Sequence, residues 1–233
     1  SFQSLSLSPE TLKAIQAQGF DTTTPIQAQA IPTLLQGHDL IGQAQTGTGK
    51  TAAFGIPIVE SVRADRRQAQ ALVLCPTREL ASQVAEAIGK LLKFRPGMLV
   101  ATLVGGEPLP RQFRVLAKCP QILVATPGRL LDHMRRGAVD LDGIRTVVLD
   151  EADEMLDMGF RPDIERILQA TPQDRQTVLF SATMSRSILE LARRYQREPH
   201  MVNVMPSAEE AGEDRRIEQA YVEVQRRKKI DAL

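Results

Sequence analysis

A glycine-rich octapeptide, Ala44-Gln45-Thr46-Gly47-Thr48-Gly49-Lys50-Thr51, constrains this chain more than any other stretch. It follows a short apolar run at 40–41 and precedes a segment with helical character from Thr51 to about Arg63. A strand, a glycine loop and a helix in this order form the context that a phosphate-binding loop requires. Glycines let the backbone amides turn inward around a phosphate, and the helix N-terminus adds unpaired N–H groups. The sequence therefore predicts a nucleotide-phosphate site after the first strand.

Two side chains of this loop suit nucleotide chemistry directly. Lys50 can reach the terminal phosphates, and the hydroxyl of Thr51 is placed to ligate Mg²⁺. Ala44 stands where the generic pattern has its first glycine, so the match is partial. The alternative interpretation is a glycine-rich turn that carries a surface lysine.

The composition narrows the class of protein. With 42% hydrophobic residues among 233, the chain can bury a large core, and one large α/β domain could hold most of it. The formal net charge is only +1, so any contact with nucleic acid must use a local surface. Two cysteines far apart, no signal peptide and no long apolar span favour a cytoplasmic setting with no membrane partner. Aromatic residues make up 4%, so a base-stacking platform for nucleic acid is not evident.

Apolar runs alternate with helical patterns along the chain. The runs follow the phosphate loop at 71–75, 99–104, 122–124, 147–149 and 178–180. Continuous apolarity is typical of strands that are buried on both faces of a parallel sheet. Helical spacing lies between the runs, at 80–91 and 109–116 and from Thr126-Pro127 to Gly137. This alternation predicts a doubly wound α/β fold with a parallel sheet, which binds ligands at the carboxyl ends of its strands.

Two helices are expected before the first strand. Ser8-Pro9-Glu10 opens one that stops at Gly19, and a second starts near Pro25. Phe20 and Gln27 are residue types that could stack on adenine and hydrogen-bond to it. Periodicity alone instead favours a core position for Phe20 and a solvated helical position for Gln27.

A second chemical signature follows the run at 147–149, where the strand ends in Asp150 and Glu151. The first acid can hold Mg²⁺, directly or through water, and the second can orient or deprotonate a water for attack on the γ-phosphate. Paired acids also occur by chance at helix N-termini, because they suit the helix dipole. Together with the phosphate loop, they predict a nucleoside triphosphatase.

The run Asp150-Glu151-Ala152-Asp153 resembles the signature of the DEAD-box RNA helicases, bacterial type, and other blocks match this family in order and spacing. The phosphate loop, with Ala44 at its start, is similar to that of the family. Thr23 departs from the pattern, because the family usually has proline there, and this suggests a less stiff loop. The other matching blocks are Phe20 to Gln27 with Phe2 as an upstream aromatic, Pro76-Thr77-Arg78-Glu79-Leu80-Ala81, Gly105-Gly106, Thr126-Pro127-Gly128-Arg129 and Ser181-Ala182-Thr183.

The resemblance implies a RecA-like P-loop NTPase domain that uses ATP and Mg²⁺. It assigns the adenine to Phe20 and Gln27, the catalytic roles to Lys50, Asp150 and Glu151, and Mg²⁺ to Thr51 and Asp150. The residues that it implies bind the phosphates are those of the loop: Thr46, Gly47, Thr48, Gly49, Lys50 and Thr51.

The resemblance also implies a surface that contacts RNA without sequence preference. Contacts to phosphates and sugars carry no sequence information. Asp153, Ser181 and Thr183 are implied to couple the ATP state to strand separation by hydrogen bonds. The implied RNA-contacting residues are Thr77, Arg78, Gly106, Thr126, Gly128 and Arg129. From the residues alone, Arg78 and Arg129 would be ordinary solvated or ion-paired arginines.

Three domain segments are predicted. Residues 1–205 form the first RecA-like lobe, 206–216 an interdomain linker and 217–233 the truncated start of a second lobe. The basic run at 226–229 is either an RNA contact or a solvated helix start. The family's second lobe supplies arginines to the ATP site in cis, so this chain alone is expected to bind nucleotide weakly and not to unwind duplexes.

Three other functions compete with an ATP-dependent RNA helicase. A DNA helicase or translocase on the same fold is disfavoured by Asp153, by Phe20 with Gln27, and by the block at 76–81. A non-catalytic RNA clamp is disfavoured by the intact Lys50 and paired acids. A metabolic kinase is the remotest, because nothing resembles a small-molecule acceptor site. The sequence leaves the physiological RNA and the oligomeric state open.

Overall fold

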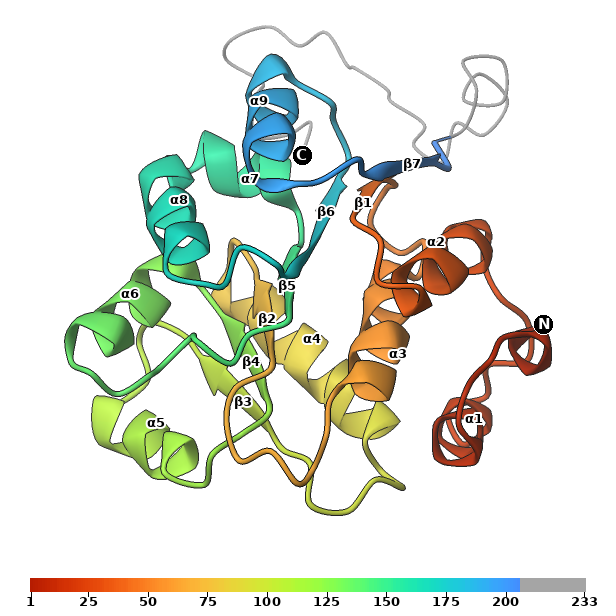
Figure 1. Ribbon diagram of the computed structural model, residues 1–233, viewed down its shortest axis with the longest axis horizontal. Helices are drawn as coiled ribbons and strands as arrows, with labels where there is room; N and C mark the ends of the chain where they lie inside the picture. Colours follow the sequence, from red (N-terminus) through yellow and green to blue (C-terminus); the bar gives the residue numbers. More distant parts are fainter. Residues whose placement is uncertain (206–233) are drawn as a thin grey trace, which may run out of the picture.

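The computed structural model describes residues 1–205, and the predicted linker 206–216 and second-lobe start 217–233 lie outside the described residues. Seven parallel strands form one sheet in the order β3-β4-β2-β5-β6-β1-β7 (Figure 1). The predicted doubly wound parallel fold is confirmed. The strands are β1 (Leu40–Gln43), β2 (Ala71–Leu74), β3 (Val100–Leu103), β4 (Ile122–Ala125), β5 (Thr146–Leu149), β6 (Gln176–Ser181) and β7 (His200–Asn203).

Helices connect the strands, and polar side chains start several of them. Ser8, Thr77 and Ser185 each accept a hydrogen bond from a backbone N–H in the first turn of the helix that follows. The helices are η1 (Phe2–Ser4), α1 (Pro9–Gln16), α2 (Pro25–Leu35), α3 (Lys50–Ser61), α4 (Arg78–Leu91), α5 (Leu109–Leu116), α6 (Pro127–Arg135), α7 (Ala152–Asp157), α8 (Arg161–Gln169) and α9 (Arg186–Tyr195). Helices α8 and α9 and the strand β7 were not predicted from the sequence.

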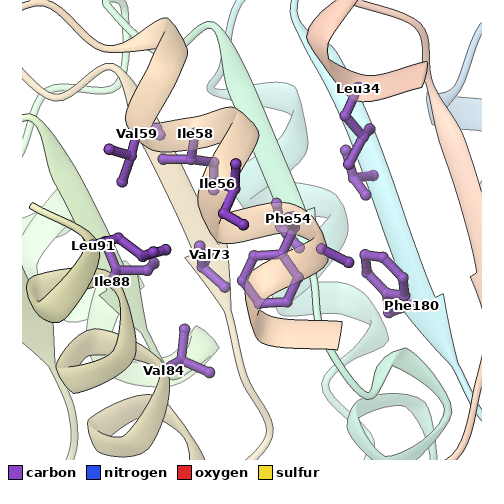
Figure 2. Packing of buried hydrophobic residues seen from close by; sticks show 14 of the residues in the cluster. Leu34, Phe54, Ile56, Ile58, Val59, Val73, Val84, Ile88, Leu91 and Phe180 are labelled. Carbon is purple, nitrogen blue, oxygen red and sulfur yellow. The ribbon is translucent and has the colours of Figure 1, made fainter. Parts of the chain in front are cut away.

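Both faces are buried at β2, β4 and β5, as the continuous apolar runs predicted, whereas β3, from the run at 99–104, is fully buried at only alternate residues. Within β2, Ala71 and Val73 pack into one core cluster, and Leu72 and Leu74 pack into the other. The first cluster includes side chains of α2, α3 and α4, and Figure 2 shows α3 lying between α4 on one side and Leu34 of α2 on the other. The second includes side chains of α6, α7, α8 and α9. The sheet therefore lies between two helical layers.

One contact in this core requires glycine. A Cβ atom on Gly42 of β1 would lie 2.3 Å from the ring of Phe180 on the neighbouring strand β6. The Phe180 ring itself packs against Phe54 of α3, with 5.7 Å between the ring centroids. The strand that leads into the phosphate loop is thus packed too closely for any larger residue.

A partly buried acid, Glu60, connects α1 to the rest of the domain. Glu60, near the end of α3, accepts hydrogen bonds from the backbone N–H and the hydroxyl of Ser8 at 3.3 and 2.7 Å, and from the hydroxyl of Thr11. Arg95 pairs with the same carboxylate at 3.2 Å, and both side chains are about 15% exposed. This cluster fixes α1, which leads into the segment that carries Phe20.

The parallel topology gathers the predicted motifs at one edge of the sheet. The phosphate loop follows β1, Thr77 follows β2, Gly106 follows β3, Thr126 follows β4 and Asp150 follows β5. The last residue of β6 is Ser181. No helix among residues 1–205 is both long and apolar enough to cross a membrane.

Candidate functional site

The phosphate loop has the backbone geometry that its glycines predicted. Gly47 and Gly49 have φ angles of +80° and +91°, which glycine adopts without strain. The hydroxyl of Thr48 donates to the carbonyl of Gln45 at 2.8 Å and closes the turn. Lys50 is only 7% exposed, and its Nζ donates to the carbonyl of Ala44 at 3.3 Å. The alternative of a turn with a surface lysine is therefore wrong.

A cavity of about 310 Å³ lies beside the loop. Five of the residues predicted to bind nucleotide line it: Phe20, Gln27, Gly47, Gly49 and Thr51. The others in that set are Thr46, which is exposed on the loop, and Thr48 and Lys50, whose contacts are described above.

The two residues predicted to bind adenine do not follow the interpretation from periodicity alone. Phe20 is 40% exposed at the cavity and not in the core, and Gln27 is 5% exposed and not solvated. Gln27 is held at both ends, since its Oε1 accepts from the N–H of Thr24 at 3.0 Å and its Nε2 donates to the carbonyl of Gly49 at 3.2 Å. Phe2, the upstream aromatic, is buried in the core at 3% exposure and does not line the cavity.

Several residues that line the cavity were missed by sequence reasoning. They come from both sides of the loop and from α4, which lies far away in the sequence: Gln18, Thr22, Thr24, Ala52, Ala87 and Leu91. Leu91 belongs to the helical spacing of α4 and was assigned only to packing, and Ala87 was not singled out. No local signal separates the lining of an apolar cavity from the core beside it.

Asp150 is a buried carboxylate with an unsatisfied oxygen. It is 2% exposed, and its Oδ1 has no hydrogen-bond partner among the described residues. Burial raises the pKa of Asp150 to about 6, although the positive charge of Lys50 opposes the shift. Glu151, the next residue, has a φ of +53°, which is uncommon for a residue other than glycine.

These residues fit a magnesium ion. Mg²⁺ is usually bound by one or two protein oxygens together with substrate phosphates and waters. The unsatisfied Asp150 Oδ1 offers one such oxygen, and the Thr51 hydroxyl lies at the first turn of α3, beside the phosphate loop. Among residues 1–205 no group of three or more His, Cys, Asp or Glu side chains could hold a metal without such phosphates.

Asp153 joins the acidic block to the end of β6. Its Oδ2 accepts hydrogen bonds from the backbone N–H and the hydroxyl of Thr183, at 2.9 and 3.0 Å. The hydroxyl of Ser181 donates to the carbonyl of Thr183 at 2.7 Å. Burial alone would raise the pKa of Asp153, but these hydrogen bonds outweigh it and lower that pKa. The structure thus brings together the three residues predicted to couple ATP state to strand separation.

The blocks predicted to contact RNA meet at the same edge. The Arg78 guanidinium lies so close to Gly106 that a Cβ there would be 1.9 Å from Nη1, and Gly106 has a φ of +74°. Arg129 Nη1 donates to the carbonyl of Glu107 at 3.0 Å. Two other residues of this predicted set differ in exposure, since Thr126 is buried and Gly128 is exposed. Thr77, the remaining member, caps α4.

Fold and site together define a class. A parallel sheet flanked by helices, with a phosphate loop after one strand and a buried acid after another, is the architecture of a RecA-like P-loop NTPase domain.

Comparison with known proteins narrows the class to a family. The model of the DEAD/DEAH box helicase family matches residues 24–191, so the chain belongs to this family. The chain is 53% identical over 232 residues to the DEAD-box ATP-dependent RNA helicase CshA of Geobacillus kaustophilus, covering 100% of this chain and 49% of that protein. It is 51% identical over 232 residues to CshA of Bacillus subtilis, covering 100% of this chain and 46% of that protein.

A solved structure shows the same fold. The crystal structure of a DEAD box protein from the hyperthermophile Methanococcus jannaschii matches with a TM-score of 0.84 at 42% identity. The match covers 99% of this chain and 61% of the other. The chain spans about half the length of the curated relatives it matches.

Proposed function

We propose that this chain is the ATP-binding first lobe of an ATP-dependent RNA helicase that separates short RNA duplexes or remodels RNA–protein complexes. One observation carries the proposal: the cavity beside the phosphate loop opens at the same sheet edge as Asp150 and the blocks around Arg78 and Arg129. A second RecA-like lobe in cis completes both sites. The prediction of a cytoplasmic location stands on the sequence alone.

Nucleotide binding uses the cavity and the loop. The base packs on Phe20, and its hydrogen-bonding edge meets Gln27, whose amide is oriented by Thr24 and Gly49. The loop residues Thr46, Gly47, Thr48 and Gly49 offer backbone N–H groups to the phosphates at the N-terminus of α3. Lys50 leaves the Ala44 carbonyl and donates to the terminal phosphates.

Hydrolysis depends on the two acids. Asp150 and Thr51 would hold Mg²⁺, which would supply positive charge to stabilise the phosphates as hydrolysis proceeds. Glu151 orients the attacking water and takes its proton. In related systems an arginine at the γ-phosphate accelerates transfer by about 10³–10⁵. Because the second lobe supplies such arginines in the family, this chain alone hydrolyses ATP hardly at all and does not unwind duplexes.

RNA binding uses the backbone of one strand. Phosphates and sugars meet Thr77, Arg78, Gly106, Thr126, Gly128 and Arg129, a set of amides, hydroxyls and guanidinium groups without base-reading geometry. The hydrogen bonds between Asp153 and Thr183 support a coupling role for the block that ends β6. When ATP and RNA bind between closed lobes, the strand bends and can no longer remain paired.

The test is the steady-state ATPase of the protein extended through its second lobe, with single-stranded RNA and with DNA of the same sequence. We expect stimulation by RNA only. Equal stimulation by DNA would instead favour a translocase on the same fold.

A matched variant tests the catalytic assignment. Glu151→Gln keeps the side chain's shape but removes the base, so RNA-stimulated turnover should fall by at least about 10² while nucleotide still binds. Unchanged turnover in this variant would favour a non-catalytic RNA clamp.

A further inference from the structure

The loop after β3 is held by side chains rather than by the sheet. Among the strands of residues 1–205, β3 lies at the edge of the sheet and pairs with β4 alone, and it ends at Leu103. The next residues, Val104 to Glu107, include Gly106 of the predicted RNA surface. Arg129 already holds the carbonyl of Glu107 at 3.0 Å.

A buried glutamine holds the other end of this loop. Gln112 of α5 is 1% exposed, and its Nε2 donates to the carbonyl of Val104 at 2.9 Å. That carbonyl immediately precedes Gly105, so the hydrogen bond fixes the peptide from which the glycine pair departs. Because a carbonyl only accepts, this bond also fixes which end of the Gln112 amide carries nitrogen.

The oxygen end of Gln112 faces a buried histidine. Gln112 Oε1 lies 2.7 Å from Nε2 of His133, a residue of α6 whose side chain is fully buried. An amide oxygen has no proton to give, so Nε2 of His133 must carry the hydrogen. His133 Nδ1 is then a bare acceptor, and it has no partner among the described residues. Burial and the charge of Arg129 lower the pKa of His133, partly offset by Asp132, so the ring is neutral at pH 7.

Two residues on one face of α6 hold the loop after β3, one directly and one through Gln112. Arg129 and His133 are four residues apart on α6 and therefore lie on one face. Arg129 binds the end of the loop directly, and His133 binds its beginning through Gln112. The helix that opens with the Thr126–Arg129 block thus holds the glycine loop at both ends.

We infer that His133 and Gln112 are positioning residues for RNA binding: they set the backbone of Gly105-Gly106 relative to Arg129 without touching RNA themselves. This inference rests on the proposed function, since Gly106 and Arg129 are its RNA-contacting residues. It predicts that a donor at position 133 is needed for RNA affinity and not for nucleotide affinity.

The test compares two variants of the 233-residue chain. His133→Leu removes the donor, and His133→Gln restores an amide N–H at a similar reach. His38→Leu is the control, because His38 precedes β1 and so lies at the amino ends of the strands, opposite the carboxyl ends where the glycine loop lies. A single-stranded oligouridylate is titrated into ¹⁵N-labelled protein, and a fluorescent ADP analogue reports the nucleotide site.

We expect His133→Leu to weaken oligouridylate binding about three- to tenfold, the effect of one lost hydrogen bond. His133→Gln and His38→Leu should bind within about twofold of the parent, and ADP affinity should stay constant throughout. ¹⁵N spectra of the parent should show the His133 proton on Nε2. Should His133→Leu fail to fold, Gln112→Met removes both hydrogen bonds at nearly constant volume and is expected to weaken binding in the same way.

Each contrary result has a distinct meaning. Equal oligouridylate affinity in His133→Leu and the parent overturns the inference alone, as does a His133 proton on Nδ1. Parallel loss of oligouridylate and ADP affinity without rescue by His133→Gln indicates a purely structural role and also overturns it. A parent chain that shows no response to oligouridylate overturns this inference, whereas the proposed function is overturned only if RNA also fails to stimulate the ATPase of the two-lobe protein.

Discussion

Asp150→Asn should make the metal-free chain more stable at neutral pH. Asp150 is 2% exposed with an unsatisfied Oδ1, and its pKa of about 6 lies above the ordinary value of 3.8. Burial therefore opposes ionisation of the Asp150 carboxyl, and the positive charge of Lys50 offsets only part of that effect. The gap between the two pKa values corresponds to about 3 kcal/mol of destabilisation once the carboxyl is charged. Asparagine keeps the shape and carries no charge, so it removes this cost.

The sign of the pH dependence follows from the raised pKa. Stability from a protonated Asp150 is fully present below 3.8 and is lost as the pH rises through about 6. The advantage of Asp150→Asn should thus reach about 2–3 kcal/mol at pH 7.5, or roughly 5–10 °C in Tm for a domain of this size. At pH 4.5 most of that advantage should be gone, because the parent has regained its proton.

Urea unfolding of both proteins with EDTA, at pH 4.5, 6.0 and 7.5, measures the difference directly. Asp153→Asn is a control of opposite sign, because hydrogen bonds lower the pKa of Asp153 and favour its charged form. Asp150→Asn with parental stability at pH 7.5, or an advantage that is the same at pH 4.5, would refute the reasoning.

Three further predictions concern packing, coupling and the N-terminal helix. Gly42→Ala should destabilise the chain by about 2–4 kcal/mol in urea unfolding, because its Cβ would overlap a buried ring, whereas Gly105→Ala has open space and should change stability by less than about 1 kcal/mol. Thr183→Val removes a hydroxyl donor, and in the two-lobe protein it should reduce duplex unwinding more than RNA-stimulated ATPase; equal losses would argue against a coupling role. Glu60→Ala should cost about 2–4 kcal/mol because it leaves a half-buried arginine unpaired, while Glu86→Ala, at an exposed pair, should cost less than about 1 kcal/mol.

Local patterns predicted the elements that position the site. The phosphate loop and the acids after β5 are contiguous in sequence, and their chemistry depends on backbone turns that glycine and strand ends specify locally. The apolar runs predicted five strands within a residue or two of their bounds, because strands buried on both faces must be continuously apolar.

The features that the sequence did not predict depend on residues that lie far away along the chain. β7 has only one buried residue in four and is held as a strand by pairing with β1. Periodicity placed Gln27 in solvent, but a hydrogen bond to Gly49, 22 residues away, buries it. The pairing of Gln112 with His133 spans 21 residues, and neither residue belongs to a motif.

The hydrogen bond from Gln27 to the Gly49 carbonyl makes one side chain common to the base pocket and the phosphate loop. A nucleotide whose base fits poorly would pull this amide away from Gly49, which has no room for a Cβ beside it. The misfit would then shift the peptide that leads into Lys50. In the two-lobe protein, a poorly fitting base such as guanine should therefore slow turnover at saturating nucleotide as well as weaken binding.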